Sequence, residues 1–152
     1  MDLAEIINKQ VQLFLMIDEL SKEKYKPTIS SVELEQITKK MSLLYVKTNN
    51  NEALIEQSLD EYSEEELLVN IEMLDRSISA ATSSIETLEA RMNNILYRGD
   101  EAYHNNKLAS VSTFDKIYFK YSTDLQKARK KVNYCSELKE LFESKFKKKK
   151  LY

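Results

Sequence analysis

Apolar residues between positions 67 and 95 recur at alternating steps of four and three. These positions are Leu67, Ile71, Leu74, Ile78, Ala81, Ile85, Leu88, Met92 and Ile95. Such spacing is a heptad seam, which is typical of helices that pack as coiled coils. Ser63 and Glu66 have the spacing of a capping box, and Gly99 suits a left-handed helix stop. The sequence therefore predicts one long helix that begins after Ser63 and ends near Gly99.

A second long helix is expected from Thr113 to about Lys149, after a polar connection. Its seam positions are Phe114, Tyr118, Tyr121, Leu125, Ala128, Val132 and Cys135. The register then slips, because Lys139 takes the next seam position while Leu138 and Phe142 carry the apolar face. This slip resembles a stutter, where supercoiling relaxes locally. The two long helices most simply form an antiparallel hairpin with its loop at about 99–112.

The N-terminal part predicts a pair of shorter helices. The first covers residues 3 to about 24 and stops before Pro27, since the residue preceding a proline is disfavoured in helical geometry. The second begins after Ser30, which has capping-box spacing to Glu33, and runs to about Lys47. The polar run 48–51 predicts a break, and a short helix is expected to follow it.

The predicted fold class is therefore all-α. An N-terminal helix pair at 1–48 is followed by a long antiparallel helical hairpin with coiled-coil packing at 52–152. Gly and Pro occur once each, which argues against a sheet-rich fold with many tight turns. The lone Cys135, the lack of a secretory signal and the shortness of every apolar run favour an intracellular protein, cytoplasmic or nuclear.

Charge is distributed unevenly although the net charge is only −2. Residues 52–101 carry 13 acidic and 3 basic side chains (net −10), and residues 102–152 carry 5 acidic and 13 basic ones (net +8). In an antiparallel hairpin the acidic run 60–66 would lie beside the basic run 145–150. Each cluster would also suit its own helix dipole, so we expect the two runs to neutralise each other.

Apolar positions on the predicted helices are candidates for contact with partner helices, which include a second copy of the chain. They are Leu13, Leu15, Met16, Ile71, Leu74, Ile78, Ile85, Leu88 and Phe119. The first three lie outside the main apolar face of the first helix, and Phe119 lies off the seam of its helix. A hairpin that also docks a partner chain and a homodimeric coiled coil both fit the seam.

Four consecutive lysines close the last predicted helix and form a candidate basic patch. They are Lys147, Lys148, Lys149 and Lys150. Such a run suits a nuclear import signal, a phosphate-binding or membrane-surface patch, or a solvated helix end. Aromatic residues interleaved with lysines between residues 114 and 121 also suit stacking on nucleic acid. The sequence leaves these alternatives open.

Residues for catalysis or metal binding are sparse. Glu101 and His104 have the Glu-x-x-His spacing of di-metal helical bundles, but that site requires two such motifs and the chain has one histidine. We therefore expect no enzyme activity, cofactor or metal. The predicted function is a non-catalytic structural or adaptor subunit that binds partner helices within a larger intracellular assembly. The alternative is a nucleic-acid-associated helical factor of the chromatin or recombination type, acting through its basic C-terminal helix.

Overall fold

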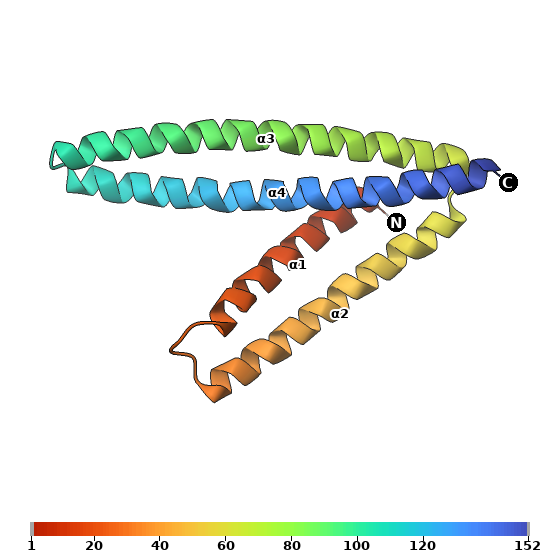
Figure 1. The fold of residues 1–152 in the computed structure, drawn as a ribbon, viewed down its shortest axis with the longest axis horizontal. Helices are drawn as coiled ribbons and strands as arrows, with labels where there is room; N and C mark the ends of the chain where they lie inside the picture. The colour runs from red at the N-terminus through yellow and green to blue at the C-terminus, as the bar shows by residue number, and fades with distance from the viewer. Residues whose placement is uncertain (1, 152) are drawn as a thin grey trace.

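The computed structural model describes residues 2–151, which form four α-helices and no strand. Helix α1 spans Leu3–Lys24, α2 spans Ser31–Glu61, α3 spans Glu64–His104 and α4 spans Leu108–Leu151. Helices α3 and α4 lie antiparallel along their whole length and form the hairpin (Figure 1). Helices α1 and α2 form a shorter antiparallel pair, the arm, which leaves the base of the hairpin at an angle. The predicted all-α fold with its helical hairpin is confirmed.

The hydrophobic core lies where the arm meets the base of the hairpin. All four helices contribute to it, and α1 packs against both α2 and α4. Its buried members are Leu3, Ile6, Ile7, Val11, Ile55, Leu59, Leu67, Ile71, Leu74, Tyr134, Cys135, Leu138 and Phe142. Beyond this junction each pair continues as a layer of only two helices. Whether the arm and the hairpin are separate domains, divided near residues 48–52, stays a prediction.

The helix starts follow the capping signals in the sequence. The Ser30 hydroxyl accepts a hydrogen bond from the Glu33 backbone N–H at 3.1 Å. Ser63 and Glu66 form a complete capping box, in which each side chain accepts a hydrogen bond from the other residue's backbone N–H. Helix α1 ends at Lys24, before Pro27. These local predictions hold because a cap satisfies backbone groups that the helix itself leaves unpaired.

The predicted break at residues 48–51 is wrong, since α2 runs through it without interruption. The reason is that Thr48 and Asn51 occupy seam positions of α2. Buried Leu44 precedes them and buried Ile55 follows them, at steps of four and three. Polar residues at these positions face the neighbouring helices rather than a loop, and they are hydrogen-bonded there.

The predicted loop at 99–112 is also wrong in extent, because only residues 105–107 separate α3 from α4. Gly99 is helical, and a Cβ built on it would lie 3.8 Å from the Phe114 Cβ, an ordinary contact. Asn106 supplies the left-handed residue instead, with φ of 57°. Asparagine tolerates this conformation better than most residues, so the turn needs no glycine.

The expected neutralisation of the acidic and basic runs is present at the base of the hairpin, where α4 meets the end of α2 and the α2–α3 connection. Lys145 pairs with Asp60 at 2.5 Å, and the Lys149 ammonium donates to the Tyr62 backbone carbonyl. The hydrogen bond from Lys145 lowers the pKa of the Asp60 carboxyl. Further along, the hydrogen bond between Lys139 and Asp75 raises the pKa of the Lys139 ammonium. The predicted antiparallel hairpin therefore brings the acidic and basic runs together as expected.

Candidate functional site

The hairpin seam is occupied within the chain. Ile71 and Leu74 are buried in the four-helix core, with 9% and 0% of their surface exposed. Ile78, Ile85 and Leu88 are half-buried on the α3 seam, and Ile78 still packs against the four-helix core. Most of the apolar surface of these five candidates is therefore used by the fold itself. Their additional contact with a partner stays a prediction.

Leu15 and Phe119 lie in different surroundings. Leu15 is half-buried against the core and lines a cavity of about 430 Å³ between α1 and α4. Phe119 is 73% exposed on α4. A single exposed aromatic is common on protein surfaces, so Phe119 alone does not define a site.

Leu13 and Met16 line a groove of about 360 Å³ between the two helices of the arm, the arm groove. Its walls are Lys9, Gln12, Leu13 and Met16 of α1 and Lys47, Asn50 and Asn51 of α2. Met16 is 46% exposed and Leu13 is half-buried. The structure therefore brings two of the predicted partner residues together in one concave, partly apolar surface.

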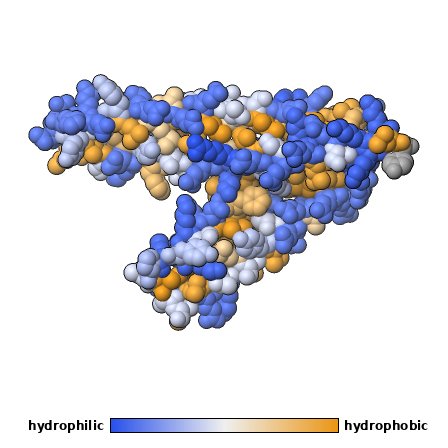
Figure 2. All heavy atoms as spheres, in the orientation of Figure 1, coloured by the Kyte–Doolittle hydropathy of each residue, from blue (hydrophilic) through white to orange (hydrophobic). Residues whose placement is uncertain are grey.

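The apolar surface continues along α2 beyond the groove walls. Leu43 lies four residues before Lys47, and Leu54 lies four residues after Asn50, so both share the face of α2 that lines the groove. Leu43 is 65% exposed and Leu54 is 49% exposed. Figure 2 likewise shows hydrophobic residues at the surface of the arm, among hydrophilic ones. The sequence analysis did not single out these two leucines.

A buried polar cluster lies directly beneath the arm groove. The Gln10 side chain is fully buried, donates to the Thr48 carbonyl at 3.2 Å and accepts from the Asn51 amide at 2.8 Å. Asn51 also lines the groove, so the cluster forms part of its floor. Sequence reasoning missed Gln10, although it lies on the apolar face of α1 between Ile7 and Phe14, which was the available signal.

Tyr134 of α4 extends this cluster toward the hairpin. Its hydroxyl is buried and has no hydrogen-bond partner of ordinary geometry among residues 2–151. Against the larger effect of burial, the nearby Gln10 side chain acts to lower the pKa of Tyr134. Burial dominates and raises the pKa of Tyr134 to about 12. The Tyr134 ring also packs edge-on against Phe14 at 5.4 Å between centroids. Polar contacts therefore link α1 and α2 at the place where the arm joins α4.

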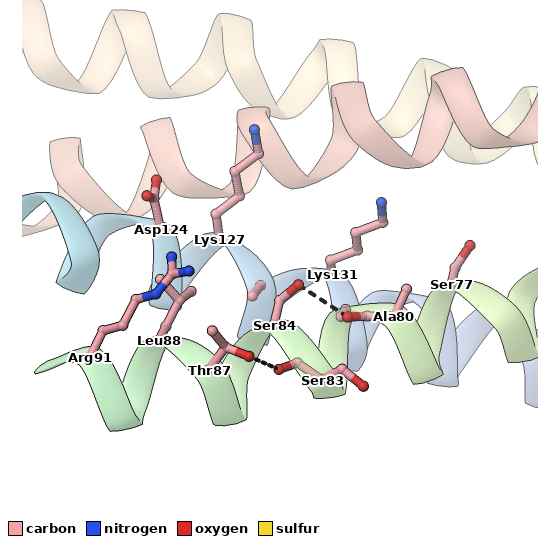
Figure 3. A pocket seen from close by; sticks show the side chains of 12 residues that line it. Ser77, Ala80, Ser83, Ser84, Thr87, Leu88, Arg91, Asp124, Lys127 and Lys131 are labelled. Carbon is pink, nitrogen blue, oxygen red and sulfur yellow. Dashed lines mark hydrogen bonds between the residues drawn. The ribbon is translucent and has the colours of Figure 1, made fainter. Parts of the chain in front are cut away.

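A second groove, the hairpin groove, has a volume of about 530 Å³ and lies between α3 and α4 (Figure 3). Small residues of α3 line it, including Ala80, Ser83 and Ser84. Its charged lining consists of Arg91 from α3 and of Asp124, Lys127 and Lys131 from α4. Figure 3 shows Lys127 and Lys131 extending side by side from α4.

Only two of the four consecutive lysines make contacts within the described part of the chain. Lys149 binds the Tyr62 carbonyl, and Lys150 lies over the Phe146 ring at 5.3 Å from its centroid. Lys147 and Lys148 are exposed. The end of α4 is thus anchored to the α2–α3 connection through Lys149, and the other three lysines are exposed.

The titratable groups outside these surfaces form no arrangement that suggests chemistry. Cys135 is fully buried, and burial raises the pKa of its thiol, which disfavours the reactive thiolate. Glu101 and His104 are exposed on the last turn of α3. Within residues 2–151, no cluster of three or more His, Cys, Asp or Glu side chains is placed to hold a metal ion. No described helix has an apolar stretch long enough to cross a bilayer.

Comparisons of the chain with protein-family models, with curated proteins and with solved structures found no match. The candidate site therefore rests on the geometry of the chain alone, and the arm groove with its flanking leucines is the surface that this geometry favours.

Proposed function

We propose that the protein is a non-catalytic adaptor or structural subunit that holds a partner helix against its arm, within a larger assembly inside the cell. The observation that carries this proposal is the uncovered apolar face shared by α1 and α2. Met16, Leu43 and Leu54 are each about half exposed or more, beside a groove of about 360 Å³. Exposed apolar surface that gathers around a groove is typical of a protein-binding site.

The architecture supports the same reading. A helix pair buries one face of each helix, and a third helix laid into the groove between them covers apolar residues of both. The arm joins the hairpin through a four-helix core, so the groove is carried on a supported element rather than on a loop. The hairpin would then serve as a long spacer or as a second contact surface.

The test is affinity capture with two matched double variants. Met16→Asp/Leu43→Asp places two charges beside the arm groove, and Leu68→Asp/Val69→Asp places two on exposed positions of α3. We expect the arm variant to lose a protein that the wild type and the α3 variant both retain. That protein would be identified by mass spectrometry and its binding repeated with purified components.

The proposal is contradicted if all three proteins capture the same partners with equal yield. Circular dichroism of each variant supplies the control for folding. All four altered residues are exposed, so a lost interaction with an intact helical spectrum reports on the surface itself.

The hairpin groove favours a second candidate function, binding to nucleic acid. Arg91, Lys127 and Lys131 gather there and form no ion pair among the described residues. Arg129 and Lys130, in contrast, are paired with Glu89 and Asp18. If this groove binds phosphate, the protein should bind duplex DNA or RNA with an affinity that falls steeply as salt is raised. Lys127→Glu/Lys131→Glu should abolish that binding. Capture of a protein that persists at high salt, where binding to phosphate is lost, would favour the first function.

A further inference from the structure

We infer that the partner of the arm is an acidic amphipathic helix, with apolar residues at steps of three and four and carboxylates beside them. This inference rests on the proposed function and adds the chemistry of the partner. It follows from two properties of the arm surface: its spacing and the sign of its charges.

The first property is a second heptad pattern on each helix of the arm, beside the buried one. On α1 it consists of Lys9, Leu13, Met16 and Leu20, at steps of four, three and four. On α2 it consists of Lys40, Leu43, Lys47, Asn50 and Leu54, at steps of three, four, three and four. We call these nine positions the outer seam. Two neighbouring helices that both carry such a seam along one groove have the geometry of a three-helix coiled coil that lacks its third member.

The groove walls connect the two halves of the outer seam. Lys9, Leu13 and Met16 line the arm groove from α1, and Lys47 and Asn50 line it from α2. The remaining members follow by helical spacing along the same faces. The seam therefore runs along most of α1, a length over which a partner helix can make several successive contacts.

The second property is the charge of the outer seam, whose only charged members are Lys9, Lys40 and Lys47. Lys9 pairs with Glu5 of its own helix at 3.0 Å, and both side chains remain more than 60% exposed. Lys40 and Lys47 have no carboxylate within ion-pair distance among residues 2–151. An unpaired ammonium is costly to cover, so lysines within a seam favour a partner helix that carries glutamate at the facing positions.

The same charges disfavour a second copy of the chain as the occupant. A symmetric dimer through the outer seam would bring this surface, whose only charged members are lysines, against a second copy of itself. A membrane is also a poorer match, because the groove is concave and contains the amides of Gln12, Asn50 and Asn51. Amides in a groove suit hydrogen bonding to a polar flank of a helix rather than to lipid tails.

The experiment uses the full chain and a display library of single helices as long as α1. Every library member has leucine or isoleucine at the seam positions, and the flanking positions vary among Glu, Gln and Lys. We expect selection on the wild type to enrich Glu at the flanks. Individual Glu-flanked helices should bind about tenfold more tightly than their Lys-flanked counterparts at low salt, the sum of a few partly exposed charge pairs.

Two charge-reversal variants provide the matched comparison. Lys9→Glu/Lys40→Glu/Lys47→Glu reverses the outer seam and should shift the enrichment from Glu to Lys. Lys107→Glu/Lys116→Glu/Lys120→Glu makes the same change in net charge at exposed positions near the hairpin loop and should leave the enrichment of Glu intact. A preference that follows net charge instead of position would overturn the inference.

The remaining outcomes separate this inference from the proposed function. Helices that bind without charge preference, and are lost in Met16→Asp/Leu43→Asp, would refute the acidic partner and leave the adaptor function standing. Helices unaffected by that variant, or none enriched at all, would refute both. Dimers by light scattering, or binding to phosphatidylserine vesicles that the outer-seam reversal abolishes, would assign the surface to a second copy or to a membrane and overturn the inference.

Discussion

The hairpin and the arm are both antiparallel helix pairs, yet they use their apolar residues differently. In the hairpin each helix has one principal seam, and the two seams pack against each other. At the base the arm completes this burial, and Leu67 and Leu74 have 0% exposure there. In the arm each helix has two seams, of which one is buried and the other open. A helix pair with a second seam has more apolar surface than its own packing requires. The difference teaches why the proposed partner is placed on the arm, although the hairpin is the more conspicuous helix pair.

Charge sharpens the contrast between the two pairs. Acidic α3 and basic α4 are linked by Asp75–Lys139 at 2.6 Å and Glu89–Arg129 at 2.9 Å. The ion pairs between two residues of the arm, such as Glu5–Lys9, each join residues four apart on one helix, and none joins α1 to α2 among the described residues. The complementary charges of the hairpin helices thus meet each other, whereas Lys40 and Lys47 of the outer seam form no ion pair among residues 2–151.

The largest effect is expected from placing a charge in each seam. Leu74→Asp would put a carboxylate at a position with 0% exposure and should lower the free energy of unfolding by about 4 kcal/mol or more. Leu43→Asp, at 65% exposure on the outer seam, should lower it by less than about 1 kcal/mol. Urea titrations followed by circular dichroism measure both. Equal losses would mean that the outer seam is covered in the free protein.

The features that could be predicted from the sequence are those set by residues close together along the chain. Heptad spacing and caps identified all four helices, because both depend on residues within one or two turns. The antiparallel hairpin predicted from two connected helices also predicted that residues 60–66 meet residues 145–150 at its base, and the Asp60–Lys145 pair confirms this. These are the features for which local pattern and tertiary packing agree.

The features that sequence could not supply arise where three helices meet. Thr48 and Asn51 suggested a break because polar residues are frequent in loops, and only the position of Gln10 on α1 shows why they are buried. The α2 half of the outer seam was missed for a related reason, whereas Leu13 and Met16 of the α1 half were among the predicted partner contacts. From the sequence, the face of α2 with Leu43 and Leu54 is as good a candidate for burial as the face with Leu44 and Ile55. The position of α1 decides which of the two faces is covered.

The second prediction tests the buried polar cluster that fixes the register of the arm. Gln10→Ala would leave the Asn51 amide and the Thr48 carbonyl without their partner, which should lower the free energy of unfolding by about 1–3 kcal/mol. Gln12→Ala, two positions along on the exposed side of α1, is the matched control and should be nearly neutral. The measurement is the midpoint of urea unfolding. A neutral Gln10→Ala would show that the cluster does not position α2 against α1.

The third prediction concerns the hydroxyl of Tyr134. Removing a buried hydroxyl without a good hydrogen bond should leave stability unchanged or raise it by up to about 1 kcal/mol, so Tyr134→Phe is expected not to destabilise. Burial raises the folded-state pKa of Tyr134 from 10.0 to about 12, so its neutral form is favoured in the folded state. This contribution is complete below pH 10 and is lost as pH rises through the folded-state value.

Unfolding free energies measured at neutral pH and between pH 10 and 12 check both parts. The wild type should lose more stability over the alkaline range than Tyr134→Phe does. Parallel curves would mean that Tyr134 is solvated in solution, and hence that the arm does not pack on α4 as described. Tyr62, whose pKa burial also raises, titrates in both proteins and cancels from the comparison.

The smallest effect comes from two neighbouring residues of α4 that reach in different directions. Arg129 pairs with Glu89 inside the hairpin at 2.9 Å, and Lys130 pairs with Asp18 of the arm at 2.7 Å. Both pairs are partly exposed, so double-mutant cycles with alanine should give coupling energies of about 0.2–1 kcal/mol each, shrinking at high salt. Coupling for both pairs would mean that the arm is held against the hairpin as firmly as α3 is. Coupling for Arg129–Glu89 alone would mean that the part of the arm near Asp18 moves relative to α4 in solution. A partner on the outer seam would then have to order the arm as well as bind it, and this ordering would lower the affinity.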